Sequence, residues 1–104
     1  MIKFIAVKNT DGSIRQFTVS GHSGFAESGE DIVCAAVSST VWMTINGIEK
    51  QNLARLEYEE RDGFVDCTVV EKFSDGADVL LNSLVMFIAE LSGQYKEFLK
   101  LTQV

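Results

Sequence analysis

The feature that most constrains this chain is an uncharged stretch from Ile32 to Ile48, seventeen residues without Asp, Glu, Lys or Arg. It is too long for an ordinary strand, and good helix formers fill its first half. A membrane span is the main alternative, but the stretch is short for one and polar or small residues interrupt it. These residues are Ser38, Ser39, Thr40, Thr44, Asn46 and Gly47. The sequence therefore predicts a buried helix from Asp31 to about Gln51. Its Trp42 and Met43 belong either to the core, which we favour, or to an interface with a second copy of the chain.

Short segments in which apolar and polar residues alternate occur in pairs joined by Asp-Gly turns, the pattern of β-hairpins. One hairpin precedes the predicted helix and one follows it. Their strands cover Met1–Val7 with Ile14–Ser20, and Ala54–Glu59 with Phe64–Glu71. Cys67 has the same parity as Val65 and Val69 in the last of these strands, so we expect its thiol in the core.

Apolar residues recur every three or four positions after Ser74-Asp75-Gly76, a sequence that can start a helix. They are Ala77, Leu80, Leu81, Leu84, Ile88, Leu91, Tyr95 and Phe98. The resulting order, ββαββα, predicts an α+β two-layer sandwich of two hairpins, each followed by a helix, with both helices packed on a largely antiparallel sheet. Since no linker interrupts 104 residues, we expect a single domain over residues 1–104.

Charge and cysteine usage exclude several classes of function. Nine Lys and Arg against fifteen Asp and Glu give a net charge of −6, whereas nucleic-acid binding needs a clustered excess of cations. We therefore expect no direct nucleic-acid contact and a preference for basic partners. Two cysteines and one histidine are too sparse for a metal site, and no phosphate-binding loop is present, so no metal or cofactor is expected. The first residues lack the long apolar run of a secretory signal, which predicts a cytoplasmic protein with reduced thiols and no membrane partner.

The segment between the first hairpin and the predicted helix concentrates chemical groups. Gly21, Gly24 and Gly29 fall within nine residues, and such a loop lets the backbone approach a ligand and is expected to be flexible. The only histidine, His22, stands near its start, and Cys34 lies just beyond its end. A thiol and an imidazole are the parts of a cysteine nucleophile and its proton partner.

Cys34 falls in the first two turns of the predicted helix whether Asp31 or Ser28 is the N-cap. Free amide groups and the helix dipole there favour the thiolate, and a protonated His22 would add to this preference. Ser38 lies one turn further on the same helical face and could orient the pair. A free cysteine near a helix start is, taken alone, more often a core residue. The residues alone leave both interpretations open.

The motif in this segment is specific. Gly21-His22 followed, after the loop, by the run Gly29-Glu30-Asp31-Ile32-Val33-Cys34-Ala35-Ala36-Val37-Ser38 closely resembles the signature of the ribosomal-processing cysteine protease family, Prp. The resemblance extends over the whole chain in length and element order. Ser23 departs from it, because Ala is expected after the histidine in many relatives, but the change only adds a hydroxyl.

The resemblance implies a small, cytoplasmic, homodimeric enzyme without a cofactor that removes a short N-terminal extension from bacterial large-subunit ribosomal protein L twenty-seven. It carries over Cys34 and His22 as the catalytic pair and Asp31 and Ser38 as supporting residues. The substrate extension implies an apolar pocket for aromatic residues beside the cut. For the oxyanion we expect the backbone N–H of Cys34 or Ala35 at the helix start.

Two alternatives stay open from the sequence. One is a non-catalytic ribosome-assembly or peptide-binding module, in which the glycine-rich loop only holds a basic protein tail. The other is a thiol-redox protein, which the sequence disfavours because the two cysteines form no Cys-x-x-Cys motif.

Overall fold

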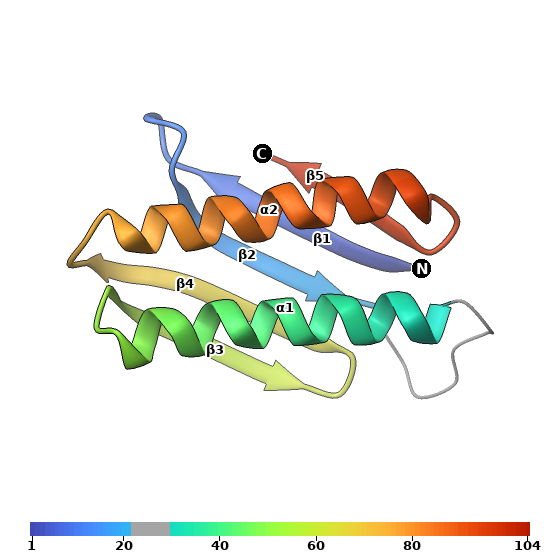
Figure 1. Cartoon of the computed structure of the whole chain (residues 1–104), viewed down its shortest axis with the longest axis horizontal. Helices are drawn as coiled ribbons and strands as arrows, with labels where there is room; N and C mark the ends of the chain where they lie inside the picture. Colours follow the sequence, from blue (N-terminus) through green and yellow to red (C-terminus); the bar gives the residue numbers. More distant parts are fainter. Residues whose placement is uncertain (22–29) are drawn as a thin grey trace.

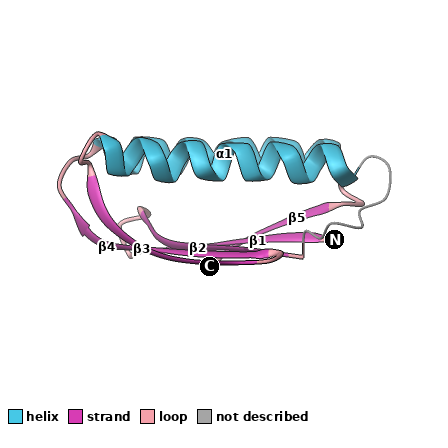
Figure 2. Cartoon of the chain, turned by 90° about the horizontal axis from the view of Figure 1, so that it is seen from below, coloured by secondary structure: helices cyan, strands magenta, loops and turns pink. Residues whose placement is uncertain are grey.

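The computed structural model of the chain describes residues 1–21 and 30–104. The elements are β1 (Ile2–Lys8), β2 (Ile14–Ser20), α1 (Glu30–Lys50), β3 (Ala54–Arg61), β4 (Phe64–Lys72), α2 (Gly76–Gln94) and β5 (Leu99–Gln103). The strands form one five-stranded sheet in the order β3-β4-β2-β1-β5, and the helices run antiparallel to each other over it (Figure 1). Figure 2 shows the two layers edge-on. The predicted α+β two-layer sandwich is confirmed.

The sheet is antiparallel except at one edge. β1 pairs with β2, β2 with β4 and β4 with β3 in antiparallel register, whereas β5 pairs with β1 in parallel. Residues of one parity point under the helices and form the core, where the rings of Phe4 and Phe17 stack with centroids 5.4 Å apart. Apolar burial of this kind is the main source of stability in a domain of this size.

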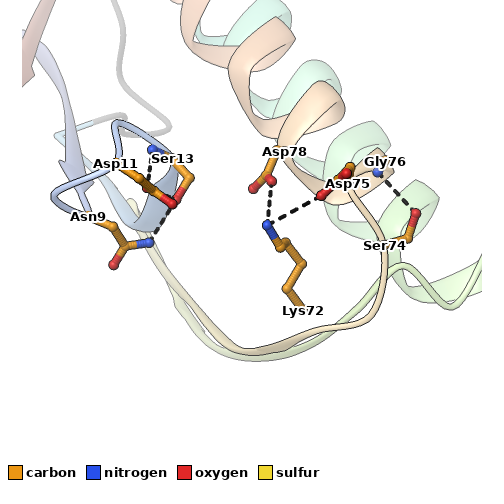
Figure 3. Close-up of polar contacts among 8 residues, drawn as sticks. All are labelled: Asn9, Asp11, Ser13, Lys72, Ser74, Asp75, Gly76 and Asp78. Carbon is orange, nitrogen blue, oxygen red and sulfur yellow. Dashed lines mark hydrogen bonds and ion pairs between the residues drawn. The ribbon is translucent and has the colours of Figure 1, made fainter.

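Both predicted Asp-Gly turns have the backbone that glycine favours. Gly12 has a φ of +89° and Gly63 a φ of +73°, conformations that other residues adopt only with strain. The Asp11 carboxylate holds the first turn by accepting hydrogen bonds from the Ser13 N–H at 2.9 Å and the Ser13 hydroxyl at 2.6 Å (Figure 3). The first hairpin is therefore closed by its own turn residues.

The uncharged stretch folds into α1, as predicted. The buried side chains recur along one face, and they are Val33, Val37, Val41, Thr44, Ile45 and Ile48. Thr44 is only 3% exposed, and its hydroxyl donates a hydrogen bond to the Thr40 carbonyl at 2.7 Å, so the helix itself satisfies this polar group. By length and composition both helices could cross a membrane, yet each buries one face on the same sheet, as a core helix does.

The start of α2 is held by polar contacts around the predicted Ser74-Asp75-Gly76 sequence. The Ser74 hydroxyl accepts a hydrogen bond from the Gly76 N–H at 3.1 Å. Lys72, at the end of β4, pairs with Asp78 at 2.7 Å and with Asp75 at 3.5 Å (Figure 3). Carboxylates in the first turn also suit the positive end of the helix.

Two expectations about the core need correction. The apolar recurrence was expected to continue the last helix to Phe98, but α2 ends at Gln94 and β5 follows. In β5, Leu99 is buried and Leu101 half-buried while Lys100 is exposed, a period of two that belongs to a strand. Met43 was expected in the core but is 67% exposed, because it lies on the outer face of α1. Trp42 is half-buried and packs against the core.

Candidate active site

Cys34 lies near the beginning of α1, four residues after its first residue, Glu30. The buried neighbours Val33 and Val37 fix the helix on the sheet, so Cys34 stands at the border between the packed face and solvent. Its side chain is half-buried and contacts the core. A thiol in this position is both anchored by packing and open to a ligand.

The described surroundings raise the pKa of the Cys34 thiol above its ordinary value of 9.0. Burial is the main cause, and the carboxylates of Glu30 and Asp31 add to it because they repel a thiolate. The amino group of Met1 acts in the opposite direction. It also pairs with Glu30 at 3.5 Å, which ties the start of β1 to the start of α1. The thiolate therefore needs a proton acceptor or a further cation close to Cys34.

Asp31 lies inside α1 rather than at its N-cap, because the helix already includes Glu30. In an α-helix each N–H bonds to the carbonyl four residues earlier, which assigns the amides of Cys34 and Ala35 to the carbonyls of Glu30 and Asp31. Only the first turn has amides without acceptors inside the helix. The role of the Cys34 and Ala35 N–H groups as oxyanion donors stays a prediction. The N–H groups of the first helical turn are competing candidates for this role.

Ser38 is half-buried on the Cys34 side of α1, one turn further along. It borders a cavity whose wall includes Trp42, the next residue at this spacing. The ring of Trp42 meets that of Tyr58 edge to face, with centroids 5.6 Å apart. The structure thus brings Cys34, Ser38 and a small cavity together along one face of α1. The sequence analysis missed this cavity, because its far wall comes from the second hairpin.

Gly21 fixes the point where β2 leaves the sheet. Its φ is +93°, and a Cβ atom there would collide with the carbonyl oxygen of Met1. Its N–H also donates a hydrogen bond to the Gly63 carbonyl at 3.1 Å. Only glycine meets both the conformational and the spatial requirement. His22 follows Gly21 directly in the sequence. Backbone packing at Gly21 therefore fixes the point from which the segment with the imidazole starts.

The remaining predicted site residues fall outside the described residues. These are His22, Gly24 and Gly29, and Ser28 as a possible cap. Cys67, by contrast, is described fully. It is 1% exposed, and burial, with Asp66 and Glu49, raises its pKa to about 12. Its predicted place in the core is confirmed, and among the two cysteines only Cys34 is open to a substrate.

Comparison with known proteins decides the class of this protein. The family model for the cysteine protease Prp matches residues 1–100. The chain belongs to the Prp family of cysteine proteases. It is therefore an enzyme that hydrolyses peptide bonds, and the alternatives of a non-catalytic module and a thiol-redox protein are set aside.

Relatives from three bacteria agree with this assignment. The chain is 25% identical over 103 residues to the ribosomal processing cysteine protease Prp of Staphylococcus aureus, with 97% of each chain covered. It is 27% identical over 112 residues to that of Bacillus subtilis, covering 98% of this chain and 96% of the relative. It is 32% identical over 89 residues to that of Mycoplasma pneumoniae, covering 84% of this chain and 85% of the relative.

Solved structures confirm the Prp fold. The crystal structure of S. aureus Prp in complex with a substrate peptide matches with a TM-score of 0.92 and 24% identity over the whole of both chains. A second structure of that protein, with a covalently linked product peptide, matches with a TM-score of 0.89 and 24% identity, again over the whole of both chains.

Proposed function

We propose that this chain is a ribosomal-processing endopeptidase that removes the short N-terminal extension of bacterial large-subunit ribosomal protein L twenty-seven. The observation that carries the proposal is the match of the Prp family over residues 1–100. The names of the relatives from S. aureus, B. subtilis and M. pneumoniae, all ribosomal processing proteases, support the substrate class. The resemblance of the Gly-His and Asp-Ile-Val-Cys motifs to the family signature supports the specific substrate.

In the proposed reaction the Cys34 sulfur attacks the carbonyl carbon of the scissile peptide bond. His22 takes the thiol proton and gives it to the leaving amine as the C–N bond breaks, which leaves a thioester on Cys34. Water then attacks the thioester and loses a proton to His22, the acid product leaves, and the thiol is regenerated. Backbone N–H groups at the start of α1 hold the negative oxygen formed in each step.

The electrostatics at Cys34 support a role for His22. Burial and the carboxylates of Glu30 and Asp31 disfavour the thiolate, so the chain needs an acceptor for the thiol proton. The same carboxylates favour a protonated imidazole. An imidazole beside Cys34 would therefore act as the acceptor of the thiol proton, and Glu30 and Asp31 would stabilise the imidazolium that forms. Asp31 and Ser38 are proposed as supporting residues of this pair.

Mass spectrometry of the extended ribosomal protein, after incubation with enzyme variants, tests the proposal. Wild-type chain should remove the extension, and Cys34→Ala should not, while circular dichroism shows the same fold. Cys67→Val is the matched control, because it removes the other thiol, which is buried, and should process normally. His22→Ala should process slower by roughly 10²- to 10⁴-fold. Full processing by Cys34→Ala would contradict the mechanism.

Charge supports the choice of a basic substrate. The chain has a net charge of −6, and the acidic residues Glu30 and Asp31 precede Cys34 in the first turn of α1. Such a surface attracts a basic protein, and salt screens the attraction. Binding of the substrate to Cys34→Ala, measured by fluorescence anisotropy, should weaken as ionic strength rises. Binding that does not change with salt would argue against charge recognition.

We also propose that the enzyme acts in the cytoplasm as a homodimer, as the family resemblance implies. Light scattering on the purified chain should give twice the chain mass of 11.5 kDa. A mass equal to one chain at micromolar concentration would contradict the dimer. Fractionation of the producing bacterium should place the chain with cytoplasmic enzymes, and recovery with the membrane would contradict this location.

A further inference from the structure

The helix layer has one side that no other described element covers. Figure 2 shows α1 lying on one side of the sheet with its opposite side open. Both helices are apolar enough along their length to cross a membrane, yet only 33% of the residues in each apolar window are buried. The sheet therefore leaves most of each apolar helix exposed.

The open side of this layer is almost without charge. α1 has no charged residue from Ile32 to Ile48, and α2 has only Asp78 and Glu90. Asp78 is engaged by Lys72 at 2.7 Å. By contrast, β3 has five charged residues in eight positions. The exposed residues that we name the outer helix face recur at helical spacing and are Ile32, Ser39 and Met43 of α1 and Val79, Ser83 and Met86 of α2.

Four large apolar side chains of the outer helix face are turned to solvent. Met86 is 71% exposed, Met43 67%, Ile32 63% and Val79 62%. Among the large apolar residues of the described chain, only Val104, after the last strand, is as exposed, at 70%. A continuous exposed apolar patch marks a contact surface, whereas a single exposed apolar residue does not.

The two methionines lie near the middle of the outer helix face. The helices run antiparallel (Figure 1), and Gly47 lies beside the side chain of Leu80. Met43, four residues before Gly47, is therefore level with residue 84 of α2, about 3 Å along the axis from Met86. Flexible, apolar methionine side chains at the centre of a face suit contact with another protein surface.

We propose that the outer helix face is the contact surface of a two-fold dimer of this chain, with Met43 and Met86 at its centre. The inference rests on the proposed homodimer and assigns it a surface. Cys34 is not part of the outer helix face, because it stands at the border of the face that packs on the sheet. The assigned contact therefore does not involve the nucleophile.

Charge favours a second copy as the occupant. Each chain has a net charge of −6, so two copies repel each other at most orientations. A two-fold contact places the same patch of both chains face to face. On the outer helix face this brings no charged residues of the central patch together, whereas the acidic strand β3 would meet its own charges.

The size of the outer helix face also fits a dimer. An α1 of 21 residues is about 31 Å long, and two helices side by side are about 20 Å wide. The layer therefore offers roughly 600 Å² on each chain, and a two-fold contact removes about 1,200 Å² from water in total. This is the lower end of the range for stable interfaces between proteins.

A membrane surface is the competing occupant. Helices that lie on membranes have Lys and Arg beside their apolar face, which attract anionic lipids. Here Lys50 is the only basic residue in the two helices, and Glu30, Asp31 and Glu90 are acidic. Anionic lipids would be repelled by these carboxylates.

The first experiment introduces a charge at the centre of the outer helix face. Met43→Glu and Met86→Glu should each raise the dissociation constant of the dimer by about 100-fold or more in sedimentation equilibrium. Val104→Glu is the matched control, because Val104 is as exposed as Met86 but lies outside the face, and it should change the constant by less than about threefold. Circular dichroism should show the same fold for all variants, since the replaced side chains are exposed.

The outcomes separate the interface from the dimer. A wild-type dimer that survives both methionine substitutions would overturn the assigned surface and leave the homodimer intact. A wild-type chain that stays single at micromolar concentration would overturn both, and the peptidase assay does not depend on either. Single chains that sediment with phosphatidylglycerol vesicles, and lose this binding in Met86→Glu, would overturn the proposal in favour of a membrane.

A second experiment leaves the outer helix face unchanged and uses the three methionines of the chain. Hydrogen peroxide oxidises accessible methionines, and mass spectrometry measures each rate. The reactive thiol is removed by Cys34→Ala. Met1 is 53% exposed, less than Met43 or Met86, so in single chains it should react no faster than they do. At concentrations that give the dimer, Met43 and Met86 should react about threefold or more slower than Met1. Rates equal to or above that of Met1 in the dimer would overturn the proposal.

Discussion

Cys67 allows a prediction whose size follows from the structure. Its pKa is about 12 in the folded chain, against 9.0 for an exposed thiol. Because the folded pKa is raised, the contribution of this group to stability is complete below about pH 9 and is lost as the pH rises toward 12. In that interval unfolding releases a proton, and the free energy of unfolding falls by about 1.4 kcal/mol per pH unit. At pH 10 the expected loss is about 1.4 kcal/mol.

Urea denaturation at about pH 8 and pH 10 measures this loss. Other groups also titrate there, so the informative quantity is the difference between wild type and Cys67→Val, which has a similar volume and suits a strand. Cys34→Ala in both backgrounds removes the reactive thiol from the comparison. Between the two pH values wild type should lose about 1.4 kcal/mol more than Cys67→Val. Equal losses in the two proteins would refute the assignment of a strongly raised pKa to this buried thiol.

Three further predictions concern single residues. Glu30→Gln should lower the pKa of Cys34, because it removes a carboxylate that raises it; alkylation by iodoacetamide should then begin at lower pH, and an unchanged profile would contradict the argument. Gly21→Ala should destabilise the chain by more than Gly12→Ala in urea denaturation, because both have positive φ but only Gly21 abuts the Met1 carbonyl; equal effects would show that the contact is unimportant. Leu81→Ala should reduce the free energy of unfolding by about 2–5 kcal/mol in the same assay, since Leu81 is a buried residue of α2 and belongs to the core; a loss below about 1 kcal/mol would contradict its core position.

Most of the fold could be predicted because local patterns and global packing agree. The Asp-Gly turns, the alternation in the hairpins and the uncharged helix each point to the same sandwich. The fifth strand could not be predicted so simply. Tyr95 and Phe98 continue the helical spacing of α2, and Leu99 and Leu101 fit a strand only once an edge of β1 exists to pair with them. Tertiary pairing decided between the two patterns.

The candidate site was predictable in part. Cys34 and Ser38 could be placed on one helical face from their spacing alone, because an α-helix fixes that relation. The direction in which the described residues shift the pKa of Cys34 could not be predicted from the sequence. The helix dipole predicted a lower value, whereas burial and the side chains of Glu30 and Asp31 raise it. Burial depends on how deeply α1 settles on the sheet, and a linear sequence does not state that depth. Val65, which forms part of the cavity wall, is also far from Cys34 in the sequence, so its place in that wall could not be predicted.

The parallel pairing of β1 with β5 has a consequence for how the enzyme is made. On the side of β1 away from β2, residues 2–6 pair with residues 99–103. This side of β1 therefore stays unpaired until nearly the whole chain has been synthesised. Contacts of such long sequence separation form slowly, since the loop between them must close first. Met1, next to β1, also contacts Glu30 and Gly21. The pairing that holds the outer side of β1, the strand whose first residues contact the start of α1, therefore forms only late in folding.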